Sequence, residues 1–149
     1  MSGNEQKYIQ EAFDTNWVVP LGPNVDGFEA DLQSFIAEDR QVVALSSGTA
    51  AVHLALIACG VEPGDEVCVQ SFTFCASSNP IKYIGANPIF IDSEEDTWNM
   101  DPDLLEKAIL DRIAKTGKKP KAIIPVALYG MPYDCEGIMA IAEKYDIPV

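Results

Sequence analysis

The sequence is poor in positive charge. Its 149 residues include 10 lysines and arginines against 23 aspartates and glutamates, which gives a formal net charge of -13. A surface of this sign repels phosphate backbones and anionic lipid headgroups, so we expect neither nucleic acid nor membranes among the partners. An anionic ligand therefore has to be held locally, by backbone N–H groups at a helix end.

Metal-binding side chains are also scarce. The chain has one histidine, and its four cysteines lack C-x-x-C spacing and lie in apolar stretches (Cys59, Cys68, Cys75 and Cys135). We therefore predict no metal site and interpret the cysteines as buried, reduced thiols. We assign His53 no role, and we interpret the acidic run 92–96 as a solvated turn.

Long apolar segments are missing as well. The longest apolar runs, such as residues 122–128, are far shorter than the roughly 20 residues that cross a bilayer. The polar N-terminus has no apolar region typical of a secretory signal. The sequence thus indicates a cytoplasmic protein.

What the sequence does contain is an alternation of helical stripes with short apolar runs that are typical of buried parallel strands. This pattern predicts a three-layer α/β/α fold with a mainly parallel sheet. A strand that begins at Ile147 also makes us expect a fragment of a longer protein. The predicted helices are residues 5–15, 28–37, 49–59, 77–84 (interrupted by Pro80), 102–116 and 136–145, and the predicted strands are residues 42–45, 66–70, 89–91 and 122–128.

The first candidate site is the strand-to-helix junction at residues 45–51. Unpaired N–H groups and the helix dipole place partial positive charge at such a helix start. Gly48 permits close approach of a ligand, while Ser47 and Thr49 offer hydroxyl groups, so the segment suits a phosphate. Alternatively, Ser47 and Thr49 only cap a helix; both interpretations stay open.

The second candidate is residues 70–77, which follow the next strand. Ligands of open parallel sheets bind at the carboxyl ends of the strands. An aromatic side chain there, Phe72 or Phe74, stacks on a flat ring or, alternatively, fills the core. Tyr129 follows another strand and either lines the same cleft or belongs to a plain turn.

Five segments in order carry a family resemblance: residues 46–51 (SSGTAA), 63–66 (PGDE), 72–74 (FTF), 90–100 (FID to TWNM) and 128–130 (LYG). With these, the chain resembles the pyridoxal phosphate-dependent sugar aminotransferases of the DegT/DnrJ/EryC1/StrS family. It is most similar to the exopolysaccharide and bacillosamine types, which aminate C4 of a UDP-linked 4-keto-6-deoxy sugar. The resemblance implies part of the large domain of the fold-type I, aspartate aminotransferase-like fold.

The resemblance also implies roles for single residues. Ser47, Gly48 and Thr49 match the positions that hold the cofactor phosphate, and Phe74 matches the aromatic residue that stacks on the pyridine ring. Residues 1–27 correspond to an N-terminal helix and a substrate-approach segment, and residues 28–149 to the first part of the cofactor domain. The implied substrate-binding residues are Asn16, Trp17, Leu21, Gly22 and Tyr129.

The resemblance places two essential groups of the family beyond Val149: the aspartate that pairs with the pyridine nitrogen and the Schiff-base lysine. None of the lysines in this sequence matches that position, so we expect no catalytic residue here and an inactive fragment. The implied partners are a nucleotide-linked keto sugar, an amino-acid donor such as glutamate, and a second copy of the chain. Two alternatives stay open: a PLP-type sugar dehydratase, in which histidine replaces the lysine, and a non-catalytic ligand-binding module.

Overall fold

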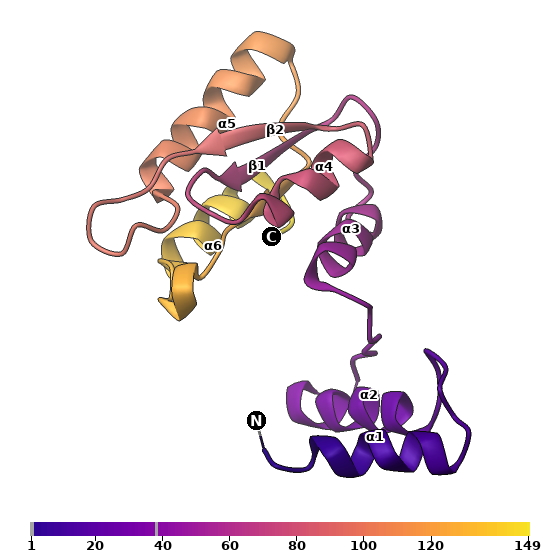
Figure 1. Ribbon diagram of the computed structural model, residues 1–149. Helices are drawn as coiled ribbons and strands as arrows, with labels where there is room; N and C mark the ends of the chain where they lie inside the picture. The colour runs from indigo at the N-terminus through magenta and orange to yellow at the C-terminus, as the bar shows by residue number, and fades with distance from the viewer. Residues whose placement is uncertain (1, 38) are drawn as a thin grey trace. The chain divides into compact units, whose positions relative to one another are not determined.

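The computed structural model describes residues 2–37 and 39–149. The chain forms two compact units, residues 1–45 and residues 46–149. Figure 1 shows the helices and strands of each unit.

The first unit contains two helices, α1 (Glu5–Asp14) and α2 (Pro23–Ile36). Helix α2 begins five positions before the predicted start at Phe28. Pro23 suits the first helical position because its ring fixes φ and it has no N–H to leave unpaired. Gly22 precedes it with a φ of 142°, a conformation that favours glycine. Neither helix has a buried residue.

The strand predicted at residues 42–45 was wrong. The segment has no regular secondary structure, and no strand pairs with it among the described residues. Val43 and Leu45 are exposed, and the N–H of Ala44 donates to the side chain of Glu29 at 2.7 Å. Without a neighbouring strand, an apolar run has no ladder to join.

The second unit is built on three parallel strands in the order β2-β1-β3: β1 (Glu66–Gln70), β2 (Asn87–Ile91) and β3 (Ala122–Ile124). β3 ends before the predicted Leu128 because Pro125 has no N–H for the ladder. Residues 147–149 form no strand, although the N–H of Ile123 donates to the carbonyl of Pro148 at 2.9 Å.

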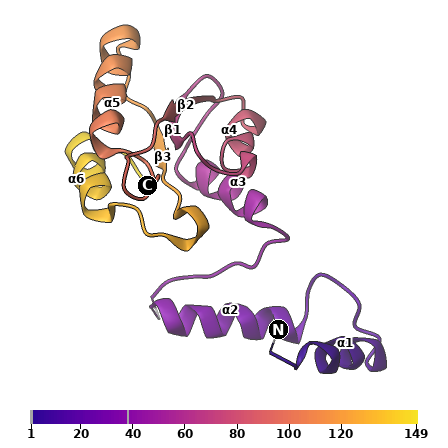
Figure 2. The same cartoon turned by 60° about the vertical axis from the view of Figure 1, so that its left-hand side comes forward.

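Helices cover both faces of this sheet (Figure 2). One face packs against α3 (Gly48–Ala58) and α4 (Asn79–Tyr83), and the other against α5 (Pro102–Thr116) and α6 (Cys135–Tyr145). Side chains alternate along β1: Val67 and Val69 join the first core, and Cys68 joins the second. The three-layer α/β/α architecture is confirmed.

Helix boundaries in this unit follow local chemistry. Asp101 caps α5 by accepting the N–H of Leu104 at 3.1 Å, and Gly117 ends it with a left-handed φ of 73°, as predicted. Pro80 does not interrupt a helix: it lies in the first turn of α4, after the short 3-10 helix η1 (Cys75–Ser77). A second 3-10 turn, η2 (Leu128–Gly130), follows β3.

The cysteine prediction was half wrong. All four cysteines are free thiols and Cys68 is buried, but Cys75 and Cys135 are exposed. Cys75 begins η1 and Cys135 begins α6, and at such helix starts apolar neighbours in the sequence do not imply burial.

Candidate functional site

Helix α3 begins with an open N-terminus. Ser47 is its N-cap residue, and its Oγ accepts the N–H of Ala50 at 3.2 Å. Within residues 2–37 and 39–149, no protein acceptor pairs with the N–H of Gly48 or Thr49. A Cβ built on Gly48 meets no atom within 4 Å. The capping interpretation is therefore correct for Ser47, and two donors remain available for an anion.

Phe74 lies in the loop between β1 and η1. Its side chain is 78% exposed, so it does not fill the core. The neighbouring Phe72 is 47% exposed and packs edge-to-face against Trp98, with ring centroids 6.2 Å apart. Phe74 thus presents a free aromatic face, as a stacking residue requires. η1, which directly follows it, packs against α3.

Gln70, the last residue of β1, is a buried polar link that the sequence did not reveal as part of the site. Its side chain is 0% exposed. The Nε2 group donates to the carbonyl of Phe72 at 2.9 Å, and Oε1 accepts the N–H groups of Met100 at 3.0 Å and Val126 at 3.2 Å. One carboxamide therefore joins the loops that follow all three strands.

Asn99 is a second buried carboxamide of this kind. Its Oδ1 accepts the N–H of Leu128 at 3.0 Å, and its Nδ2 donates to the carbonyl of Met131 at 2.9 Å. These two bonds lie on either side of Tyr129 and fix η2 against the loop that follows β2.

Glu94 organises that loop. Its carboxylate accepts the hydroxyl of Thr97 and the backbone N–H groups of Asp96, Thr97 and Asn99. The hydrogen bond from the Thr97 side chain, followed by the backbone donors, holds the pKa of Glu94 below its ordinary 4.5. The acidic run is therefore partly a structural loop, and no cluster that suits a metal ion occurs among the described residues.

Two adjoining hollows lie beside these loops. The larger, of about 750 Å³, is lined by Phe72, Asp96, Thr97, Trp98, Leu128, Tyr129, Gly130, Met131 and Pro132. The smaller, of about 470 Å³, is lined by Phe72, Thr73, Phe74, Val126, Leu128 and Tyr129. They share three residues. The structure therefore brings together two predicted site residues, Phe74 and Tyr129.

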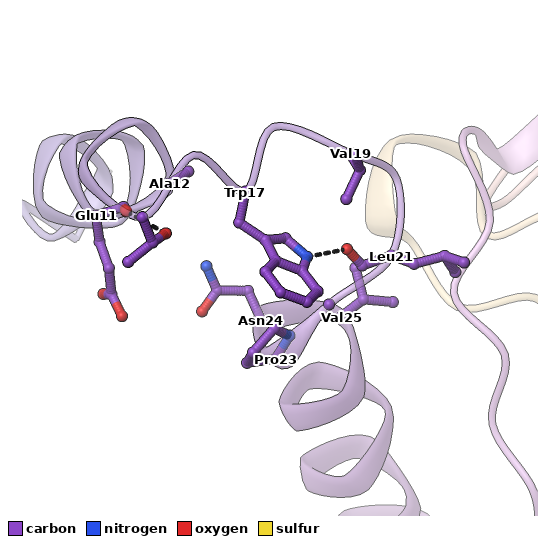
Figure 3. A pocket seen from close by; sticks show the side chains of 10 residues that line it. Glu11, Ala12, Trp17, Val19, Leu21, Pro23, Asn24 and Val25 are labelled. Atoms are coloured by element: carbon purple, nitrogen blue, oxygen red, sulfur yellow. Dashed lines mark hydrogen bonds between the residues drawn. The ribbon is translucent and has the colours of Figure 1, made fainter.

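The predicted substrate residues of the first unit form a separate hollow of about 310 Å³ (Figure 3). Trp17 points into it and donates its Nε1–H to the carbonyl of Leu21 at 2.6 Å. A Cβ on Gly22 would lie 2.1 Å from that nitrogen, so only glycine fits beneath the ring. Trp17, Leu21 and Gly22 line the hollow, whereas Asn16 does not.

His53 takes no part in these hollows. Its ring packs edge-to-face against Tyr83, with centroids 5.9 Å apart, which is a packing role. Across the part of the chain that the structure describes, no helix is both long and apolar enough to span a bilayer.

Comparison with known proteins matches residues 1–149 to the model of the DegT/DnrJ/EryC1/StrS aminotransferase family. The chain is 50% identical over its whole length to EpsN of Bacillus subtilis, named as a pyridoxal phosphate-dependent aminotransferase, and 38% identical to a GDP-perosamine synthase of Caulobacter vibrioides. It spans 38% of the length of each. Among solved structures, an aminotransferase of this type from Brucella abortus superposes with a TM-score of 0.87 at 36% identity, covering 95% of this chain and 38% of that one.

Proposed function

Because the chain belongs to the DegT/DnrJ/EryC1/StrS aminotransferase family, we propose that it forms the first part of a pyridoxal phosphate-dependent sugar aminotransferase. In this proposal residues 28–149 are the N-terminal part of the cofactor domain, and residues 1–27 approach the substrate. The whole enzyme transfers an amino group from glutamate to a nucleotide-linked keto sugar for surface polysaccharides. It works as a cytoplasmic homodimer.

The observation that carries the proposal is the open start of helix α3. The unpaired N–H groups of Gly48 and Thr49, together with the dipole of an 11-residue helix, suit a dianionic phosphate in a chain with few cations. Nothing stands within 4 Å of a Cβ on Gly48, which leaves room for the phosphate oxygens. The Thr49 hydroxyl adds a further donor. These residues fit the phosphate end of the cofactor.

Phe74 supplies the second contact. Its exposed ring lines a hollow beside Thr73 and Tyr129, so a flat pyridine ring has an aromatic face to stack against. When bound, pyridoxal phosphate supplies an electron sink for amino-group transfer. The part played by these residues is to hold its phosphate and its ring in a fixed orientation.

The hollow around Trp17 is our candidate for the sugar end of the substrate. The indole is locked by the carbonyl of Leu21 and by the absence of a side chain on Gly22. Glu11 and Asn24 add polar groups to its lining. Carboxylate and amide groups of this kind are suited to sugar hydroxyls.

The test is isotope transfer in a protein of the relatives' length that carries these 149 residues. With [15N]glutamate and a nucleotide-linked keto sugar, mass spectrometry is expected to find 15N in the sugar product. The 149-residue chain alone, with pyridoxal phosphate added, is expected to give no turnover. Turnover by the chain alone, or no transfer to any keto sugar by the longer protein, contradicts the proposal.

A further inference from the structure

The larger hollow contains two strained aromatic residues. Trp98 and Tyr129 both have left-handed backbones, with φ of 63° and 51°. Bulky residues rarely adopt this conformation, and it persists only where the surroundings enforce it. Neither residue gains burial in return: the side chain of Trp98 is 60% exposed and that of Tyr129 is 97% exposed.

The surroundings that enforce the strain are specific. Asn99 directly follows Trp98 in the chain. Its carboxamide accepts the N–H of Leu128 and donates to the carbonyl of Met131, on either side of Tyr129. Asn99 is itself 0% exposed. The backbone beside two aromatic residues on the rim of one hollow is therefore fixed by a buried carboxamide that donates one hydrogen bond and accepts another. The backbone of this rim is pre-organised for a ligand, because it needs little further ordering in the binding step.

The lining defines the class of ligand. Phe72, Trp98 and Tyr129 supply aromatic faces, and Met131 and Pro132 add apolar surface. The lining contains no lysine, arginine or histidine, whereas it contains the carboxylate of Asp96. These groups disfavour a phosphate and favour a neutral flat ring that carries N–H donors.

We propose that this hollow binds the nucleobase of the nucleotide-sugar substrate, stacked on Trp98 and Tyr129, with a ring N–H donating to Asp96. This inference rests on the proposed function for the origin of the base. The hollow shares Phe72, Leu128 and Tyr129 with the smaller one beside Phe74, so a base held here lies next to the proposed cofactor contact.

Fluorescence of Trp98 provides a direct test in the 149-residue chain. The chain has two tryptophans, and Trp17→Phe leaves Trp98 as the single emitter. We expect saturable quenching by GMP or by UMP, the two bases being compared to identify the preferred one, and no quenching by ribose 5-phosphate, which carries the phosphate without a base. Equal responses to all three compounds, or no response to any, overturn the inference.

Variants of Tyr129 test the stacking partner. Its side chain is exposed, so substitution is expected to leave the fold intact, which circular dichroism checks. Tyr129→Leu is expected to weaken nucleotide binding at least about fivefold, since base–aromatic stacking is lost, and Tyr129→Phe is expected to retain it. Phe35→Leu, at an exposed aromatic residue of α2, is the matched control and is expected to change nothing.

The remaining outcomes are equally decisive. If Tyr129→Leu binds nucleotide as tightly as the parent chain, the inference is overturned. It is also overturned if nucleotides have no effect while Tyr129→Leu converts a dimer to a monomer in sedimentation, because the hollow then receives a second copy of the chain. The titration uses neither pyridoxal phosphate nor an amino donor, so its result is independent of the isotope-transfer test of the proposed function.

Discussion

The side-chain oxygen of Gln70 accepts the backbone N–H of Met100 at 3.0 Å, inside a region that water does not reach. The same oxygen also accepts the N–H of Val126, which leaves no free acceptor position on the carboxamide. A strand residue therefore supplies the acceptor for one backbone N–H group in each of two loops. This one side chain thus links the loops that carry Phe72, Trp98 and Tyr129 to the end of the central strand.

Gln70→Leu is expected to destabilise the chain by about 2–6 kcal/mol. The substitution keeps the volume but leaves two buried N–H groups unpaired, each with a penalty of about 1–3 kcal/mol. Urea unfolding measures the loss, and hydrogen exchange at Met100 and Val126 is expected to accelerate. Gln41→Leu, at an exposed position, is the control and is expected to change stability by less than about 0.5 kcal/mol. Equal effects of the two substitutions contradict the role of Gln70.

Neither buried carboxamide could be predicted from the sequence. The two N–H groups that the Gln70 side chain accepts lie 30 and 56 residues away, and the partners of Asn99 lie about 30 residues away. Secondary-structure propensity and the periodicity of apolar residues describe neighbours along the chain, and they do not reveal hydrogen bonds between distant segments. A polar residue at the end of an apolar strand was the one available signal, and it fits an exposed strand end equally well.

Elements with local signals were predicted well. The helix from Pro102 to Thr116 has its N-cap aspartate, its N1 proline and its final glycine within its own sequence. The predicted strand at residues 42–45 failed because a strand depends on a partner as well as on its composition. For the same reason the sequence could not decide whether Phe74 fills the core: its exposure depends on where its loop lies.

Thr49→Val tests the phosphate cradle in a protein of the relatives' length. A hydrogen bond to a charged group contributes about 1.5–3 kcal/mol, so the dissociation constant of pyridoxal phosphate is expected to rise roughly tenfold to a hundredfold. Equilibrium dialysis measures it. Ser47→Ala is the comparison, because Ser47 caps α3 and its loss is expected to lower stability by about 1 kcal/mol. Unchanged cofactor affinity in Thr49→Val means that the segment is a helix cap alone.

Phe74 is expected to affect cofactor binding more than folding. In the same longer protein, Phe74→Leu removes the stacking face and is expected to weaken binding by about 0.5–1.5 kcal/mol. Phe74→Trp is expected to preserve both binding and the melting temperature, since the side chain is not packed in the core. A Trp variant with a lowered melting temperature, beside a Leu variant with unaltered binding, rules out stacking.

The cysteines are expected to react with a thiol reagent in order of exposure. Burial, with a contribution from the nearby Glu66 carboxylate, raises the pKa of Cys68 from its ordinary 9.0 to about 12. Because the thiolate is the reactive form, Cys68 is expected to stay unmodified in the native chain at pH 8, while the exposed Cys75 and Cys135 react first. Peptide mapping after alkylation identifies the sites. Labelling of Cys68 at the rate of Cys75 contradicts this order.

The pKa of Cys68 also predicts a stability change at alkaline pH. The unfolded chain releases this proton from about pH 9, whereas the folded chain holds it to about pH 12. The contribution of the Cys68 thiol to the free energy of unfolding is therefore complete below pH 9 and declines as the pH rises above it. Urea unfolding at pH 8 and pH 10 measures this decline. Cys68→Ala is expected to remove the part of the decline that comes from the Cys68 thiol, whereas the control Cys75→Ala is expected to retain it.

Glu94 is expected to make the position of Trp98 sensitive to acid. The Thr97 hydroxyl and backbone donors hold the pKa of Glu94 below 4.5, so the folded loop favours the carboxylate. The stabilisation is complete above about pH 4.5 and is lost as the pH falls through the lowered value. In the Trp17→Phe background, Trp98 emission is therefore expected to change below pH 4.5. Glu94→Gln is expected to remove that transition, whereas Glu95→Gln, at an exposed neighbour, retains it; a transition unchanged in Glu94→Gln assigns the acid response to another group.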